Sequence, residues 1–407
     1  MELGPIFRAL MHNKSRFWLI ALEVALTLAI VTNCINVMLD MRSEFLKPSG
    51  MDEDNLLVVF TEPFAAEFKE EEFVDALRDE DLLRLRSFPG VAEASGFHQI
   101  PLSGSGSASS RRPAGSELET TVAPLFIVTD RALQTLDVDL IEGRDFTAAD
   151  FDFDMEAYEQ GDAVRNVILN QALAQKLFPD ESAVGKVIQN DSSDRAETVI
   201  GVVGTLLNSW PSSRYGEDAM LLPGKPGNEY RMRYIVRTEP GASGSVYAEL
   251  EGLMRDTEPG RVITIRTMEE VKRRQFVMNL ALIKILTVVI FLLVAVTSIG
   301  IIGLTSFSVT ERTRQIGTRR ALGATRVDIV RHFLVENWMI TGFGLALGLV
   351  LTIGLNIALT NAADAPKMDW YLLVGGPVLL WATGIVAALL PAIRASKVAP
   401  EIATRTV

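Results

Sequence analysis

Residues of the kinds that carry out catalysis or bind metals are few in this sequence and form no recognisable sets. The three histidines, His12, His98 and His332, are far apart, and none has a partner at the spacing of metal ligands. The single cysteine, Cys34, lies inside an apolar run, so the chain cannot form an internal disulfide. No Ser/His/Asp or Cys/His set can be assembled around these positions. We therefore predict a protein with no catalytic residues and no metal site.

A phosphate-binding loop is also absent from the sequence. The pattern G-x-x-x-x-G-K-[ST] does not occur, because Gly185-Lys186 and Gly224-Lys225 lack both the preceding glycine and the following hydroxyl residue. If ATP drives this protein, we expect another chain to bind it.

The residues best suited to recognition form an arginine-rich segment at residues 310–337, with the sequence TERTRQIGTRRALGATRVDIVRHFLVEN. Ile316, Arg319, Arg320 and Gly323 follow at helical spacing, and Gly323-Ala324 breaks this helix before a second begins near Val327. Arginines on a short helix, with Ile316 and Leu322 as apolar knobs, predict a surface that docks into a groove of another protein. The residues alone leave a second interpretation open, a membrane-surface helix held by anionic lipid. The candidate contact residues are Glu311, Arg312, Arg314, Gln315, Ile316, Gly317, Arg319, Arg320, Leu322, Gly323 and Ala324.

Apolar runs place this segment in a membrane protein. The chain has 407 residues, 22% of them charged, and a mean hydropathy of +0.22, which favours membrane helices combined with a soluble domain. A helix needs roughly 20 apolar residues to cross the hydrocarbon core. The first such run lacks a plausible cleavage site, so we expect a retained signal anchor. The predicted spans are residues 17–39, 276–307, 338–360 and 371–393, with a large domain at 40–275.

Basic residues in short loops predict the orientation of these spans. The arginine-rich loop, residues 308–337, contrasts with the loop at 361–370, which has only Lys367 as a basic residue. Both termini, including the tail at 394–407, are therefore predicted in the cytoplasm, and the large domain on the outer side of the membrane. Residues 40–279 carry a net charge of about −18, which argues against nucleic-acid binding. Solubility explains this charge, with attraction of cationic cargo as the alternative.

Two further regions, the N-terminal residues and the large domain, lie outside the predicted spans. Residues 1–16 show a helical apolar face and predict an amphipathic helix on the cytoplasmic leaflet, or one packed on the bundle. Strand-like and helical runs alternate through residues 40–275 and predict an α+β domain in two subdomains. We assign one to about 50–143 with 228–266 and the inserted one to about 144–227. Residues 103–116 are rich in Gly and Ser and predict a flexible loop of unknown role.

Polar and small residues inside the spans indicate helix contacts. Glu23 is costly facing lipid, so we expect it to face the bundle or a dimer partner, with snorkelling as the alternative. Asn33 and Asn36 are candidates for bonds between helices. Gly344 and Gly348 form a G-x-x-x-G pattern for close helix contact, more consistent with packing inside the bundle than with a dimer face.

The span ends are predicted to continue as a helical stalk. Residues 40–48 and 267–279 contain no internal Gly or Pro before Pro48 and are rich in charge. Ordinary solvated helix ends are the alternative. The stalk residues with possible ion pairs are Asp40, Glu44, Lys272, Arg273 and Arg274.

The arginine-rich segment resembles the cytoplasmic coupling segment of the MacB/FtsX permease family, which runs E-R-[RT]-x-E-I-G-x-x-[RK]-A-x-G-A. Gln315 replaces the usual Glu, which removes one expected polar contact. Residues 391–400, PAIRASKVAP, resemble the closing pattern of the same family. The matching positions are Glu311, Arg312, Ile316, Gly317, Arg320, Ala321, Gly323 and Ala324.

The large domain carries a separate resemblance, to the MacB periplasmic core domain. The motifs occur in order along residues 128–146, 169–186 and 200–203, as VTD…LDV…GRDF, LNQALA…LF…VGK and IGVV. MacB itself carries a fused ATPase domain, for which these residues show no equivalent.

The resemblance implies a non-catalytic ABC-transporter permease of the bacterial inner membrane, with its large domain in the periplasm, that works by mechanotransmission. Its implied partners are a separate ATPase that binds ATP and Mg, a second permease copy or paralogue, and the lipid bilayer. For the MacB type, the resemblance further implies efflux of periplasmic substrates with a periplasmic adaptor and a TolC-type outer-membrane channel. Lipoprotein release and control of cell-wall hydrolases, as in FtsX, are alternatives within the family. A membrane sensor of peptide antibiotics is an alternative from another class.

Overall fold

The computed structural model describes residues 14–116, 120–152, 158, 163–190, 195–226, 231–363 and 365–398. The chain divides into a helical unit, Met1–Phe45 with Met278–Val407, and an outer unit, Leu46–Val277. The amphipathic helix predicted for residues 1–16 lies outside the described residues, apart from residues 14–16, which begin the first described helix.

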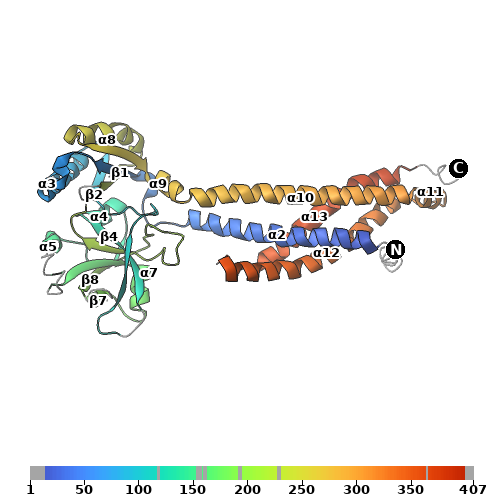
Figure 1. Cartoon of the computed structure of the whole chain (residues 1–407), viewed down its shortest axis with the longest axis horizontal. Coiled ribbons are helices and arrows are strands. Elements are labelled where there is room, and N and C mark those ends of the chain that lie inside the picture. Colours follow the sequence, from blue (N-terminus) through green and yellow to red (C-terminus); the bar gives the residue numbers. More distant parts are fainter. Residues whose placement is uncertain are drawn as a thin grey trace. The chain divides into compact units, whose positions relative to one another are not determined.

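The helical unit consists mainly of long helices, one preceding the outer unit in the chain and the others following it (Figure 1). Among the described residues, four helices are long and apolar enough to cross a membrane, and the fold class predicted from the sequence is confirmed. The long helices are α2 (Lys14–Leu46), α10 (Val277–Glu311), α12 (Arg326–Ala363) and α13 (Trp370–Ser396), and the short α11 (Thr313–Ala321) lies between α10 and α12.

Small residues bring α2 and α12 into close contact. A Cβ atom added to Gly344 would lie 2.8 Å from the carbonyl oxygen of Ala21, and one added to Gly348 would lie 3.0 Å from the Cα of Ala25. Val24 and Leu28 of α2 are fully buried in the same core. The G-x-x-x-G pattern therefore packs inside the chain's own bundle, where backbones approach closely and gain dispersion contacts.

Polar side chains in the bundle bond to neighbouring helices. The hydroxyls of Thr27 on α2 and Thr297 on α10 are 2.8 Å apart. The Asn33 amide donates to the carbonyl of Thr352 on α12 at 3.2 Å, and the Asn36 amide donates to the carbonyl of Pro366 at 2.8 Å. These bonds satisfy polar groups that lipid cannot hydrate.

Glu23 lies against the backbone of α10. A Cβ added to Gly300 would lie 2.7 Å from both carboxylate oxygens of Glu23, so the carboxylate occupies the space that this glycine leaves free. The Glu23 side chain therefore contacts a neighbouring helix of its own bundle rather than lipid alone.

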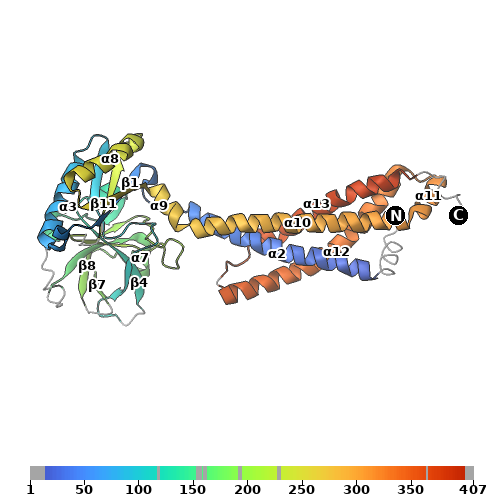
Figure 2. The same cartoon turned by 45° about the horizontal axis from the view of Figure 1, so that its top comes forward.

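The outer unit contains two sheets. The first has the strand order β11-β1-β10-β2 and is covered by the helices α3 and α8 (Figure 2). Alternate residues of the central strand β1 point to opposite faces. Leu57 and Val59 pack against these helices, whereas Leu56 and Val58 pack toward the second sheet. The elements are β1 (Leu56–Pro63), β2 (Val91–Gly96), β10 (Met232–Thr238), β11 (Arg261–Thr267), α3 (Glu71–Arg86) and α8 (Ser243–Thr257).

The second sheet has seven strands in the order β5-β8-β6-β9-β4-β3-β7. Its alternation places Phe126 and Val128 in the core shared with the first sheet, while Val167 and Leu169 pack against α7. The elements are β3 (Ser107–Pro113), β4 (Thr121–Val128), β5 (Leu140–Gly143), β6 (Arg165–Asn170), β7 (Val187–Asn190), β8 (Ala196–Val203) and β9 (Met220–Pro223), with α4 (Ala132–Leu136), α5 (Ala148–Phe151) and α7 (Gln171–Leu177).

Two predictions for the outer domain are corrected by this topology. The flexible loop predicted at residues 103–116 contains β3, which pairs with β4 on one side and β7 on the other. The predicted boundary at residue 143 also fails, because β3, β4 and β5 belong to the seven-stranded sheet. The loop was predicted from composition, but backbone pairing with two neighbouring strands stabilises β3 without apolar side chains. The boundary was predicted from the order of elements along the chain, but the order of strands in the sheet does not follow chain order.

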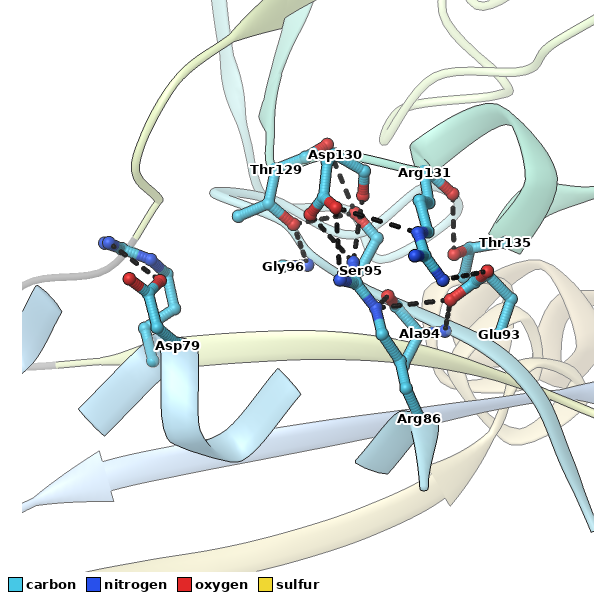
Figure 3. Close-up of polar contacts among 11 residues, drawn as sticks. Asp79, Arg86, Glu93, Ala94, Ser95, Gly96, Thr129, Asp130, Arg131 and Thr135 are labelled. Atoms are coloured by element: carbon cyan, nitrogen blue, oxygen red, sulfur yellow. Dashed lines mark hydrogen bonds and ion pairs between the residues drawn. The ribbon is translucent and has the colours of Figure 1, made fainter. Parts of the chain in front are cut away.

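Ion pairs join the two sheets near the ends of α3, β2 and β4 (Figure 3). Arg86 of α3 pairs with Asp130, which follows β4, at 2.8 Å and with Glu93 of β2 at 3.2 Å. Arg131 pairs with the same Glu93 at 3.1 Å. We call Arg86, Glu93, Asp130 and Arg131 the ionic clasp; it connects the two sheets at one edge of their shared core.

Substitution of Gly344 tests the contact between α2 and α12. Gly344→Leu forces a side chain into the space of the Ala21 carbonyl, so we expect it to destabilise the protein by about 1–3 kcal/mol. The matched control is Gly354→Leu on the same helix, because no atom lies within 4 Å of a Cβ at that position. Thermal unfolding in detergent measures both. If Gly344→Leu kept full thermal stability but dissociated a dimer, the pattern would be a dimer face instead.

Candidate coupling surface

The connection from α11 to α12 is a rigid turn. Gly323 has a φ of +101°, a conformation that other residues rarely adopt. The N–H of Ala324 donates to the carbonyl of Arg319 at 3.0 Å, and the N–H of Gly323 donates to that of Arg320 at 3.2 Å. These two bonds form a Schellman motif, which satisfies the last carbonyls of α11.

A capping box then begins α12. The hydroxyl of Thr325 accepts the N–H of Asp328 at 3.2 Å, and the carboxylate of Asp328 accepts the N–H of Thr325 at 3.0 Å. Because both helix ends are satisfied by local bonds, α11 is held at a defined angle to α12.

One face of α11 is buried. Ile316 is 4% exposed and packs with Ile329 and Phe333 of α12 and with Ala392 and Ala395 of α13. The prediction of Ile316 as an outward knob is therefore wrong. Helical periodicity tells which residues share a face, but the tertiary contacts decide which face is covered.

Two of the predicted contact arginines bond inside the chain. Nη1 of Arg312 donates to a carboxylate oxygen of Glu336 on α12 at 2.9 Å, and Nη1 of Arg320 donates to the carbonyl of Val398 at 2.6 Å. Glu336 is buried, and the sequence analysis did not single it out, although it is an acidic residue next to an apolar span. These bonds attach α11 to α12 and to the C-terminal segment.

The opposite face of α11 is exposed. Arg314, Gln315 and Arg319 are exposed, as is Leu322, at 85%. Val327, at the start of α12, is 74% exposed and was not among the predicted contact residues, although it lies one short turn beyond Gly323. We define Arg314, Gln315, Arg319, Leu322 and Val327 as the coupling surface. It combines positive charge with two exposed apolar side chains.

The predicted stalk is only partly continuous. α2 remains helical through Asp40 and Glu44 to Leu46. On the other side, α9 (Met268–Gln275) ends at Gln275, Phe276 follows as its C-cap, and α10 begins at Val277. The predicted unbroken helix over 267–279 is therefore corrected, because the buried Phe276 leaves the helical conformation.

Two of the three basic residues of α9 make ion pairs. Lys272 pairs with Glu53 of the outer unit at 2.9 Å, and Arg273 pairs with Glu269 one turn earlier at 3.0 Å. Arg274 is exposed on the same helix. Lys272 thus helps to fix α9 to the outer unit.

Two family descriptions match this chain. Residues 17–253 match the MacB-like periplasmic core domain, and residues 287–400 match the FtsX-like permease C-terminal domain. The first match covers α2 and most of the outer unit, and the second covers the rest of the helical unit, including the coupling surface.

Relatives with these domains include permeases and a longer protein. The uncharacterised ABC transporter permease YvrN of Bacillus subtilis is 25% identical over 98% of each chain. The uncharacterised ABC transporter permease YknZ of the same organism is 26% identical over 70% of this chain and 71% of its own length. The macrolide export ATP-binding/permease protein MacB of Chromobacterium violaceum is 28% identical over 64% of this chain, which spans 40% of the length of that relative.

Two solved structures are also similar to the chain. The periplasmic region of MacB from Actinobacillus actinomycetemcomitans is 16% identical, with a TM-score of 0.34, over 55% of this chain and 94% of that one. The extracellular domain of the transporter YknZ is 19% identical, with a TM-score of 0.33, over 52% of this chain and 100% of that one.

Truncation of a side chain on each face of α11 should change the stability of the protein by different amounts. Ile316→Ala removes a buried side chain, so we expect a loss of about 2–5 kcal/mol of stability. Leu322→Ala removes an exposed side chain of similar size, so we expect a change within about 0.5 kcal/mol. Thermal unfolding of the two purified variants in the same detergent compares them. Equal losses would mean that Leu322 is also part of the core.

Proposed function

The chain belongs to the family of ABC-transporter permeases with a MacB-like periplasmic core domain and an FtsX-like permease domain, and from this premise we propose that it converts the ATP cycle of a partner ATPase into movement of its outer domain. The observation that carries this proposal is the two-sided α11. Its exposed side offers the coupling surface, and its buried side is packed on α12 and α13.

The coupling surface fits a protein groove better than a lipid surface. Leu322 and Val327 stand exposed beside Arg314 and Arg319, and such a mixture of apolar and guanidinium groups is typical of protein-interface anchors. In this proposal the groove belongs to a separate ATPase, which binds ATP and Mg. The basic segment then lies in the cytoplasm, with both termini, and the outer domain in the periplasm.

Movement of α11 has a defined route through the helical unit. A displacement of α11 acts on α12 through Ile316 and through the Arg312–Glu336 ion pair. α12 contacts α2 at Gly344 and Gly348, and α2 is one uninterrupted helix from Lys14 to Leu46, where the outer unit begins. Packed helices transmit such displacements as rigid bodies.

The task proposed for this movement is export of substrates from the periplasm. The relative in Chromobacterium violaceum, which is 28% identical over 64% of this chain, is named as a macrolide export protein, which supports efflux over the other tasks. In this proposal two permease copies act together, with a periplasmic adaptor and a TolC-type channel completing the pathway.

The first experiment tests docking of the ATPase. Arg319→Glu with Leu322→Asp reverses the charge and removes the apolar anchor of the coupling surface, without touching the buried face. We expect co-purification of the cognate ABC ATPase to fall at least about tenfold, since interface anchors typically contribute 2 kcal/mol or more. Quantitative mass spectrometry of the affinity-purified complex measures it.

The matched control for docking is Lys367→Glu, an exposed charge reversal in the loop between α12 and α13. It should leave co-purification and ATP turnover unchanged. Wild-type levels of ATPase bound to the Arg319/Leu322 variant would show that the partner docks elsewhere.

The second experiment tests rigid transmission through the span ends. A Gly-Gly-Ser-Gly spacer after Met41, inside α2, combined with another after Lys272, inside α9, makes both connections flexible. We expect ATP hydrolysis by the complex to stay close to wild type while export of a reporter substrate is lost.

The control for the spacers is the same insertion after Gly115, in the exposed turn that follows β3, where a Cβ would meet no other atom. Export should survive there. If export also survived the two insertions in α2 and α9, at equal expression, the outer domain would not be driven through these helices.

A further inference from the structure

A basic pocket lies where the two sheets of the outer unit meet. It has a volume of about 460 Å³, within the range of sites for small molecules. Ile127 of β4 gives it an apolar wall, and Phe97, from the segment after β2, borders it with a side chain that is packed in the core. The polar walls are His98, Lys225, Arg231 and Arg233.

The charge of this pocket is opposite to that of its domain. Residues 40–279 carry about −18, yet every titratable residue among the described residues that line the pocket is basic. Lys225 is paired with Asp75 of α3 at 2.7 Å. Arg233 has no carboxylate partner among the described residues, and its Nη1 donates only to the backbone carbonyl of His98, at 2.8 Å. The guanidinium group of Arg233 is therefore available to bind an anion from outside the chain.

Burial and the neighbouring positive charges both disfavour the charged forms of His98 and Arg233. Burial, followed by the positive charges of Arg233 and Arg231, lowers the pKa of His98 below its ordinary value. Burial, followed by Arg231, likewise lowers the pKa of Arg233. Grouped like charges destabilise the folded domain, and a bound anion would remove that cost.

His98 also has an unused hydrogen-bonding atom. Its Nδ1 is buried and has no hydrogen-bond partner among the described residues. Its backbone, by contrast, is fully engaged: the N–H donates to Ile127 of the seven-stranded sheet at 2.9 Å, and the carbonyl accepts from Arg233 of the four-stranded sheet. Buried polar atoms are rarely left unpaired, so this nitrogen is a candidate hydrogen-bonding partner for a ligand.

We propose that this pocket binds a small anionic molecule that carries a carboxylate or phosphate group on an apolar body. Arg233 contacts the anion, the imidazole of His98 adds a hydrogen bond, and the apolar body lies against Ile127. Guanidinium groups suit this role because their N–H groups match the geometry of both anions.

Binding at this position ties the two sheets together. Arg233 and Phe97 come from the four-stranded side, whereas Ile127 and Lys225 come from the seven-stranded side. The ionic clasp of Figure 3 crosses the same junction. A ligand in the pocket therefore stabilises the joined form of the outer domain, and the site is distinct from the coupling surface.

The three histidines of the chain allow a direct test. The full chain in lipid nanodiscs, with ¹⁵N-labelled histidine, is titrated with inorganic phosphate and separately with benzoate, at constant ionic strength in sodium chloride. His98→Gln assigns the resonance. We expect a saturable shift of the His98 ring signals and a rise in the pKa of His98, since an anion stabilises the imidazolium. Binding should therefore tighten as the pH falls toward that pKa.

The variants separate a built site from general charge attraction. Arg233→Gln should weaken binding of the preferred probe about ten- to a hundredfold, because it removes a charge-assisted hydrogen bond. Arg255→Gln is the matched control, since this exposed arginine of α8 pairs only with Glu251 among the described residues. Lys225→Gln, at the pocket wall, replaces Arg233→Gln if that variant fails to fold.

The outcomes decide the proposal. Saturable binding of phosphate, benzoate or both, lost in the pocket variants, supports it, and the tighter probe identifies the anionic group. The proposal is overturned if neither probe shifts His98, if the shift never saturates, or if Arg255→Gln weakens binding as much as the pocket variants do. ATPase docking is measured separately, so either result leaves the coupling surface untouched.

Discussion

The hydrocarbon core, which supplies no hydrogen-bond partners, is the constraint on which this structure depends. Backbone polar groups inside it must be satisfied by the chain itself. Four long helices meet that requirement, and the Thr27 hydroxyl and the side-chain amide N–H groups of Asn33 and Asn36 bond to neighbouring segments. The same bonds hold α2 in the middle of its unit, where Ala21 and Ala25 are completely buried. A helix fixed on several sides can carry a displacement along its length.

The position of the coupling surface likewise depends on contacts made within the chain. α11 is a short helix that is too polar to be stable alone, and it is held by Ile316, by the Arg312–Glu336 ion pair and by the bond from Arg320 to Val398. Residues that look alike in the sequence therefore have different tasks. Arg312 and Arg320 hold the helix in place, whereas Arg314 and Arg319 remain exposed.

The outer unit shows how one sheet can serve two cores. β1 buries Leu57 and Val59 under α3 and α8 and buries Leu56 and Val58 toward the seven-stranded sheet. Without disulfides, this shared core and the ionic clasp hold the two halves together. The basic pocket lies beside the same junction, so a ligand bound there would contact residues from both halves rather than from one.

The sequence by itself determined the four spans, the α+β character of the outer domain and the family, because hydropathy, periodicity and short motifs are local properties. It also located the segment at 310–337 that contains α11. Tertiary structure decided the orientation of that helix, which buries Ile316 and exposes Leu322. It also decided the pairing of β3 between β4 and β7, and the meeting of His98 with Arg233. These features depend on contacts between residues far apart in the chain, for which no local pattern exists.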